Sequence, residues 1–230
     1  MLPLGDDNSR RHILPLVTYA LIAINVLVYF FIEVPAQDIE AFILRWGSIP
    51  SQLLAGERFE TLLTSMFLHD PFSIMHLLSN MLFLWIFGDN VEDAFGHAPF
   101  LLFYLVSGVA ASVAQALASP SATVPGVGAS GAIAGVLGAY IVLFGGNRIR
   151  VLMGPVITTV PSFVMIGLWI VLQVVSGFGT VGSNEGGVAY WAHIGGFVAG
   201  LLIAFVMRGA LTRPAVVGQR QPSPRGALRQ

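Results

Sequence analysis

The sequence predicts an all-α membrane protein, built as a bundle of six transmembrane helices. Of the 230 residues, 55% are hydrophobic and only 10% are charged, whereas an ordinary soluble domain carries about 25% charged residues. Six apolar stretches have lengths suited to a hydrocarbon core about 30 Å thick. They are Ile13–Ile32, Phe72–Phe87, Pro99–Ala118, Gly128–Phe144, Pro155–Val175 and Ala189–Met207.

These stretches divide the chain into three parts. Residues 1–12 form a short N-terminus, 13–207 form the membrane domain, and 208–230 form a tail that we expect to be disordered, because it is rich in proline and arginine. The first stretch is longer than the hydrophobic region of a signal peptide, and no clear cleavage site follows it. We therefore expect it to remain as an anchor. Cysteine is absent, which excludes thiolate catalysis.

Arginine placement predicts the orientation of the bundle. With a cytoplasmic N-terminus, nine of the eleven basic residues lie inside and only Arg45 and Arg58 lie outside, as the positive-inside rule requires. The nine are Arg10, Arg11, Arg148, Arg150, Arg208, Arg213, Arg220, Arg225 and Arg229. Both termini are thus expected in the cytoplasm. Since no transit peptide precedes the first stretch, we expect a bacterial plasma membrane.

Four polar residues lie near the N-terminal ends of the second, fourth and sixth stretches. These ends share the outer side of the bilayer in the predicted topology, and each carries a partial positive charge. His76 and Asn80 belong to the second stretch, Ser130 opens the fourth, and His193 lies early in the sixth. Three helix ends at one depth predict a single site.

The fourth stretch has about 17 residues and rises only about 25 Å. Its start, Gly128-Ala129-Ser130-Gly131, is therefore expected below the outer surface of the membrane. A serine hydroxyl at this position lies beside free backbone N–H groups, which are suited to receive an oxyanion.

Small residues predict close packing of the fourth and sixth stretches. They are Gly128, Gly131, Gly135 and Gly138 on the former, and Ala192, Gly196, Gly200 and Ala204 on the latter. Such packing makes a hydrogen bond between Ser130 and His193 geometrically reasonable, and a serine needs such a base to become a nucleophile. No carboxylate falls within the six stretches and no HExxH motif is present, so the chemistry indicated is a serine–histidine dyad.

At these residues the sequence closely resembles the rhomboid family of intramembrane serine proteases. The matching motifs are Gly128-Ala129-Ser130-Gly131, Ala192-His193-Ile194-Gly195-Gly196, His76 with Asn80, and Gly88 with Glu92 and Gly96. The resemblance runs from about Trp46 to about Met207 and implies a rhomboid-like six-helix bundle.

The resemblance implies that Ser130 is the nucleophile and His193 the general base of a serine endopeptidase. It implies an oxyanion hole made by His76, Asn80 and the Ser130 backbone N–H. It also implies no cofactor, and membrane-anchored protein substrates cut in or near their transmembrane segments. Two positions depart from the family pattern. Glu60-Thr61 replaces a Trp-Arg pair, and Ala134 replaces an aromatic residue that stacks on the histidine in some bacterial members.

Other interpretations of the same residues remain open at this point. Asn25, Gln115 and Gln173 are interpreted as polar contacts between helices. A metal site at His69, Asp70, His76 and His193 is disfavoured, because no ligand spacing typical of zinc is present. Nucleic-acid binding has no support in a net charge of −1. The alternative functions are a catalytically inactive rhomboid-like protein that binds membrane clients, and a channel or transporter for small solutes.

Overall fold

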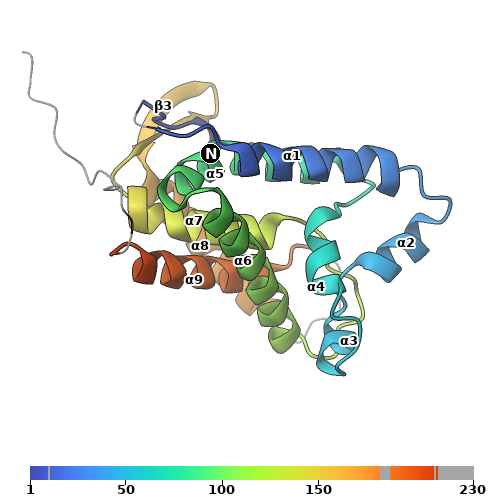
Figure 1. Cartoon of the computed structure of the whole chain (residues 1–230). Helices are drawn as coiled ribbons and strands as arrows, with labels where there is room; N and C mark the ends of the chain where they lie inside the picture. The colour runs from blue at the N-terminus through green and yellow to red at the C-terminus, as the bar shows by residue number, and fades with distance from the viewer. Residues whose placement is uncertain (10, 182–186, 210, 212–230) are drawn as a thin grey trace, which may run out of the picture.

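The computed structural model describes residues 1–9, 11–181, 187–209 and 211. Most of the described chain is helical, and one small sheet joins the helices (Figure 1). The helices are α1 (Leu16–Val28) continued by a π-helix (Tyr29–Glu33), α2 (Ile39–Trp46), α3 (Pro50–Leu54), α4 (Thr61–Thr64) continued by a 3-10 turn (Ser65–Phe67), α5 (Ile74–Phe95), α6 (His97–Ala118), α7 (Ser130–Phe144), α8 (Ser162–Phe178) and α9 (Tyr190–Met207). The strands are β1 (Leu2–Gly5), β2 (Arg148–Met153) and β3 (Val156–Pro161).

Each of the six apolar stretches contains a helix. Within the described residues, four helices are long and apolar enough to cross a membrane: Leu16–Glu33, α5, α6 and α9. The other two, α7 and α8, are apolar but shorter. A mostly helical membrane bundle is thereby confirmed, while the number of six crossings stays a prediction. Nearly all of the expected tail, residue 210 and residues 212–230, lies outside the described residues.

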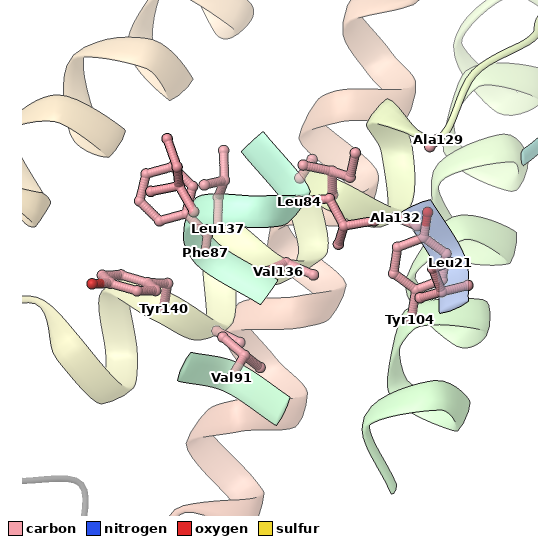
Figure 2. Close-up of a cluster of buried hydrophobic side chains, with 14 of the residues drawn as sticks. Leu21, Leu84, Phe87, Val91, Tyr104, Ala129, Ala132, Val136, Leu137 and Tyr140 are labelled. Atoms are coloured by element: carbon pink, nitrogen blue, oxygen red, sulfur yellow. The ribbon is translucent and has the colours of Figure 1, made fainter. Parts of the chain in front are cut away.

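Helix α7 lies at the centre of the bundle and contacts α5, α6, α8 and α9. Every residue from Gly131 to Tyr140 is buried. Figure 2 shows the apolar cluster around this helix, in which Phe87 of α5 meets Tyr140 edge to face with ring centroids 5.0 Å apart. A helix that is apolar on all sides is stable only when surrounded by other apolar groups, which is the position that α7 occupies.

The three-stranded antiparallel sheet, in the order β1-β2-β3, is a feature that the all-α prediction lacked. It corrects the fifth stretch, because residues from Val156 to Pro161 form a strand and the helix begins only at Ser162. The physical reason lies in the local sequence. Val156–Pro161 is rich in β-branched residues, which favour strands, and it follows the two-residue turn Gly154-Pro155, with Gly154 at a φ of 59°. The sheet lies at one end of the bundle and α2, α3 and α4 lie at the other (Figure 1).

Helix α5 continues two turns beyond the Phe87 boundary expected from the sequence, to Phe95. The expectation that no carboxylate lies within an apolar helix was therefore wrong for this element, which carries Asp89, Glu92 and Asp93. Glu33, likewise, ends the long helix that begins at Leu16. These carboxylates are tolerated because each has partners elsewhere in the chain.

Glu92 caps the start of α1. The residue before α1 is Pro15, which provides no side-chain cap. The fully buried Glu92 carboxylate instead accepts hydrogen bonds from the backbone N–H groups of Val17 and Thr18, at 2.9 and 2.7 Å, and from the Thr18 hydroxyl at 2.7 Å. A carboxylate at a helix N-terminus also interacts favourably with the helix dipole. The pairing of α1 with α5 thus depends on a polar contact between them.

The N-terminal residues are held against the same end of the bundle. Arg11 donates to Asp89 at 2.9 Å, and the Asp6 carboxylate accepts from the Tyr140 hydroxyl and the Asn90 amide, both at 2.6 Å. Burial raises the pKa of the Asp6 carboxyl to about 7. Strand β1 also pairs with β2, so residues 1–9, 11 and 12 are packed as part of the domain.

We predict that Glu92→Ala lowers the free energy of unfolding by about 3 kcal/mol, because it leaves buried N–H and hydroxyl donors without an acceptor. The measurement is thermal unfolding in detergent. Asp93→Ala is the matched control, since Asp93 accepts the N–H groups of His12 and Ile13 at the more exposed end of α5 and its loss should cost about 1 kcal/mol. Equal melting temperatures for the parent and Glu92→Ala would contradict the capping role.

Candidate active site

Ser130 is the first residue of α7 and His193 lies in the first turn of α9. The Ser130 hydroxyl oxygen is 2.8 Å from the His193 Nε2, which is a hydrogen-bonding distance. Both side chains are half-buried, while the next ten residues of α7, Gly131 to Tyr140, are buried. The two residues singled out by the sequence, 63 positions apart, therefore meet in the folded chain.

The small residues of α7 and α9 allow this meeting. A Cβ added to Gly196 would lie only 2.0 Å from the Gly131 carbonyl oxygen, and one added to Gly200 would lie 2.0 Å from that of Gly135. No side chain fits into either space. The expected close approach of the two helices is thus present, backbone against backbone.

The far side of the His193 ring is held by α8. The Nδ1 atom lies 2.7 Å from the side-chain oxygen of Gln173. The Trp169 ring, one helical turn earlier, lies against the imidazole with centroids 5.6 Å apart. The sequence interpretation missed both roles, and it assigned Gln173 only to helix packing. The available signal was the four-residue spacing, which places Trp169 and Gln173 on one helix face.

His76 and Asn80 lie one turn apart near the start of α5. The backbone N–H of Asp70 donates to the His76 Nδ1 at 3.0 Å, so the ring proton of a neutral His76 is on Nε2. That Nε2 faces Gly128, where an added Cβ would lie 2.9 Å from it and 3.6 Å from the Ser130 hydroxyl oxygen. Asn80 donates one amide N–H to the His76 carbonyl at 2.8 Å, which leaves its second N–H for another acceptor.

Gly128 adopts a φ of 130°, a conformation that residues with a Cβ rarely adopt. This backbone turns the chain into α7 at Ser130, whose N–H is one of those that no helical carbonyl can satisfy. The four side chains expected at the site, together with Gly128, Gly131 and Gly196, are therefore brought together by three helix starts.

A cavity of about 990 Å³ opens over these residues. Its described lining includes Ser130, His193, His76 and Asn80. Further walls come from α2, from α5 and α8, and from the segment before α7. A cavity of this size is at the upper end of the range for ligand sites in proteins, and its walls are mainly apolar side chains such as Phe83 and Leu137 of the bundle.

His69 lies beside the site without facing the dyad. It is fully buried, its ring meets the His76 ring edge to face at 5.1 Å, and its backbone N–H donates to the Glu33 carboxylate at 3.0 and 3.1 Å. Burial, with the nearby His76 as a second cause, lowers the pKa of His69 to about 3, so the ring is neutral at physiological pH. Among the described residues, no group of three His, Cys, Asp or Glu is arranged to hold a metal ion.

Comparison with known proteins shows the family to which the chain is related. A family model described as the rhomboid domain matches residues 56–210, which is more than half of the chain. The chain belongs to the rhomboid family. With its apolar helices, this membership makes it an integral membrane protein.

Several curated relatives match most of this rhomboid chain. The "Rhomboid protease GluP" of Bacillus subtilis (strain 168) is 32% identical over 207 residues, covering 90% of this chain and 37% of the relative. The "Rhomboid protein 1, mitochondrial" of Saccharomyces cerevisiae (strain ATCC 204508 / S288c) is 29% identical over 205 residues, covering 85% and 54%. The "Rhomboid protease AarA" of Providencia stuartii is 30% identical over 211 residues, covering 81% and 70%. The chain thus spans about half the length of the first two relatives, or less.

We predict that Gly196→Ala lowers the free energy of unfolding by about 1–3 kcal/mol, because the new methyl group pushes α9 away from the Gly131 carbonyl. Melting temperature is the measurement. Gly167→Ala in α8 is the control, since nothing lies within 4 Å of its added Cβ, and it should be neutral or stabilising by up to about 1 kcal/mol. If both variants melt alike, the close packing at Gly196 is not important for stability.

Proposed function

We propose that this rhomboid chain is an intramembrane serine endopeptidase that uses Ser130 as nucleophile and His193 as general base. The observation that carries the proposal is the 2.8 Å contact between the Ser130 hydroxyl and the His193 Nε2, two residues that line a large cavity. Two relatives are named as rhomboid proteases, which agrees with this chemistry.

In the proposed reaction, His193 Nε2 takes the hydroxyl proton as the Ser130 oxygen bonds to the scissile carbonyl carbon. The tetrahedral intermediate then breaks its C–N bond, and His193 returns the proton to the leaving amine. A water molecule next attacks the acyl-enzyme and gives its proton to His193. As this second intermediate collapses, its bond to the Ser130 oxygen breaks and His193 gives its proton to that oxygen, which releases the new carboxyl end and restores the serine.

The oxyanion is proposed to be held by three donors. These are the Nε2–H of His76, the free amide N–H of Asn80 and the backbone N–H of Ser130. The Asp70 contact supports the first role, because it keeps the proton of His76 on the nitrogen beside Gly128. Donors that are fixed before the reaction stabilise developing charge without the cost of reorientation.

The substrates are proposed to be membrane-anchored proteins, cut in or near a transmembrane segment. The apolar walls of the cavity suit a peptide that leaves a lipid environment, while hydrolysis requires water to enter. We further propose six crossings by α1, α5, α6, α7, α8 and α9, with both termini in the cytoplasm. Arg11, Arg148 and Arg150 support this orientation, because they lie at the sheet end, whereas Arg45 and Arg58 lie near α2 and α3. A bacterial plasma membrane remains the proposed location.

The second candidate is a catalytically inactive rhomboid-like protein that binds membrane clients. The cavity alone fits a binding protein as well as an enzyme. The contact of the His193 Nε2 with the Ser130 hydroxyl favours the enzyme, because a serine needs an adjacent base to become a nucleophile.

We predict that Ser130→Ala lowers cleavage of single-span substrates by at least about 10⁴-fold, with little change in melting temperature. Cleavage by the purified protein is the measurement, and Ser176→Ala in α8 is the control that should stay active. A fluorophosphonate should label Ser130 in the parent and should fail to label His193→Ala. Cleavage by Ser130→Ala at the parent rate would exclude the dyad mechanism.

We predict that Asn80→Ala lowers kcat by about tenfold with a smaller change in KM, since the lost donor acts mainly in the transition state. Ser79→Ala is the matched control, because Ser79 donates to the same His76 carbonyl at 3.1 Å. It should keep kcat within about threefold, as expected for a hydrogen bond worth about 0.6 kcal/mol in a bilayer. A lower melting temperature with unchanged kcat would assign Asn80 a structural role only.

A further inference from the structure

The two ring nitrogens of His193 face different partners. The partner on α8, Gln173, decides which nitrogen carries the proton. A neutral imidazole has one N–H donor and one acceptor nitrogen. The Gln173 side-chain oxygen, 2.7 Å from Nδ1, can only accept a hydrogen bond. The proton of the neutral ring is therefore on Nδ1, and Nε2 is left with the lone pair that faces the Ser130 hydroxyl.

The opposite arrangement would disable the base. If the amide –NH₂ group of Gln173 faced Nδ1, it would donate to that nitrogen and the ring proton would move to Nε2. The nitrogen next to Ser130 would then have no lone pair to take the hydroxyl proton. In a serine–histidine–aspartate triad, a histidine held in the wrong tautomer lowers kcat by about 10⁴-fold.

A neutral amide suits this position better than a carboxylate. Gln173 lies in the middle of the apolar helix α8, where an ionised side chain is costly. The amide oxygen accepts from Nδ1–H when the ring is neutral and equally when it has become an imidazolium. It thus holds the ring in one orientation through both protonation states without adding a buried charge.

Helix α8 also fixes the angle of the ring. Trp169, four residues before Gln173, lies against the imidazole, while the fully buried Ala134 of α7 is too small to do so. Trp191 of α9 donates its indole N–H to the Gly177 carbonyl of α8 at 2.9 Å, which ties the two helices together. Trp169 is among the described residues that line the cavity, and Gln173 is not.

We propose that Gln173 is a positioning residue for catalysis, which fixes the tautomer and orientation of His193 as a neutral third member behind the Ser130–His193 dyad. This proposal rests on the proposed function, because a tautomer matters only if His193 acts as a base. Gln173 contacts the imidazole through its side-chain oxygen and is not among the described residues that line the cavity, so its loss should lower kcat and leave KM nearly unchanged.

The test compares Gln173→Met and Gln173→Glu with the parent in detergent or proteoliposomes, using one single-span substrate. Methionine has a similar length but only a weakly accepting sulfur, and should lower kcat by about 10-fold to 100-fold, less than the cost of a fully wrong tautomer. Glutamate has an accepting oxygen whether ionised or protonated, so Gln173→Glu should keep most of the activity of the parent. The rate of fluorophosphonate labelling of Ser130 should follow kcat, since it needs the same base and no substrate.

Gln115→Met is the matched control. Its side-chain oxygen accepts the backbone N–H of Ala192 at 3.2 Å, one residue before His193, so it holds the same helix end without touching the ring. It should keep kcat within about threefold of the parent, as for other hydrogen bonds between membrane helices.

Three results would overturn the positioning role of Gln173: parent-like kcat in Gln173→Met, equal losses in the methionine and glutamate variants, or the same loss in Gln115→Met. None of these results would contradict the proposed Ser130–His193 dyad. The dyad is tested separately by cleavage with Ser130→Ala and by fluorophosphonate labelling of His193→Ala, and both results are independent of position 173.

Discussion

In a lipid bilayer, two helices gain little by burying apolar side chains against each other, because lipid tails are as apolar as leucine. What holds α7 to α9 is close contact between their backbones, made possible where Gly196 faces the carbonyl of Gly131 and Gly200 faces that of Gly135. This contact sets the separation of the two helix axes. A hydrogen bond between side chains at their ends needs that separation to be correct within a few tenths of an ångström. The Ser130–His193 distance of 2.8 Å therefore depends on the glycines between the two helices as much as on the two side chains themselves.

Local sequence signals were sufficient for the helices that form the site. The stretch Gly128–Phe144 contains α7, which begins at Ser130. The stretch Ala189–Met207 contains α9, which begins at Tyr190. Both helices are apolar over their whole length and are bounded by residues that break the pattern. The meeting of Ser130 with His193 also followed from short-range information, namely small residues at helical spacing on two stretches.

Features that depend on distant partners were beyond the same reasoning. Glu92 lowers the hydropathy of its segment. Nothing nearby in the sequence reveals that its carboxylate accepts hydrogen bonds from Thr18 at the start of α1. Gln173 resembles any polar residue in an apolar stretch until its partner on α9 is known. The hairpin before α8 was hidden for another reason. An apolar run has the same hydropathy whether it forms a strand or a helix, and only the turn at Gly154 and the β-branched residues after it favour the strand.

The two histidines of the site carry their protons on opposite nitrogens, and different kinds of group enforce this. His193 depends on a side chain, which a single substitution can remove. His76 depends on the backbone N–H at position 70, which every amino acid except proline provides. The side chain of Asp70 therefore does not decide the tautomer of His76, whereas the proposed tautomer of His193 needs a side chain at position 173 that offers an oxygen. The candidate active site thus contains one histidine whose tautomer is set by the main chain and one whose tautomer depends on a side chain that a single mutation can replace.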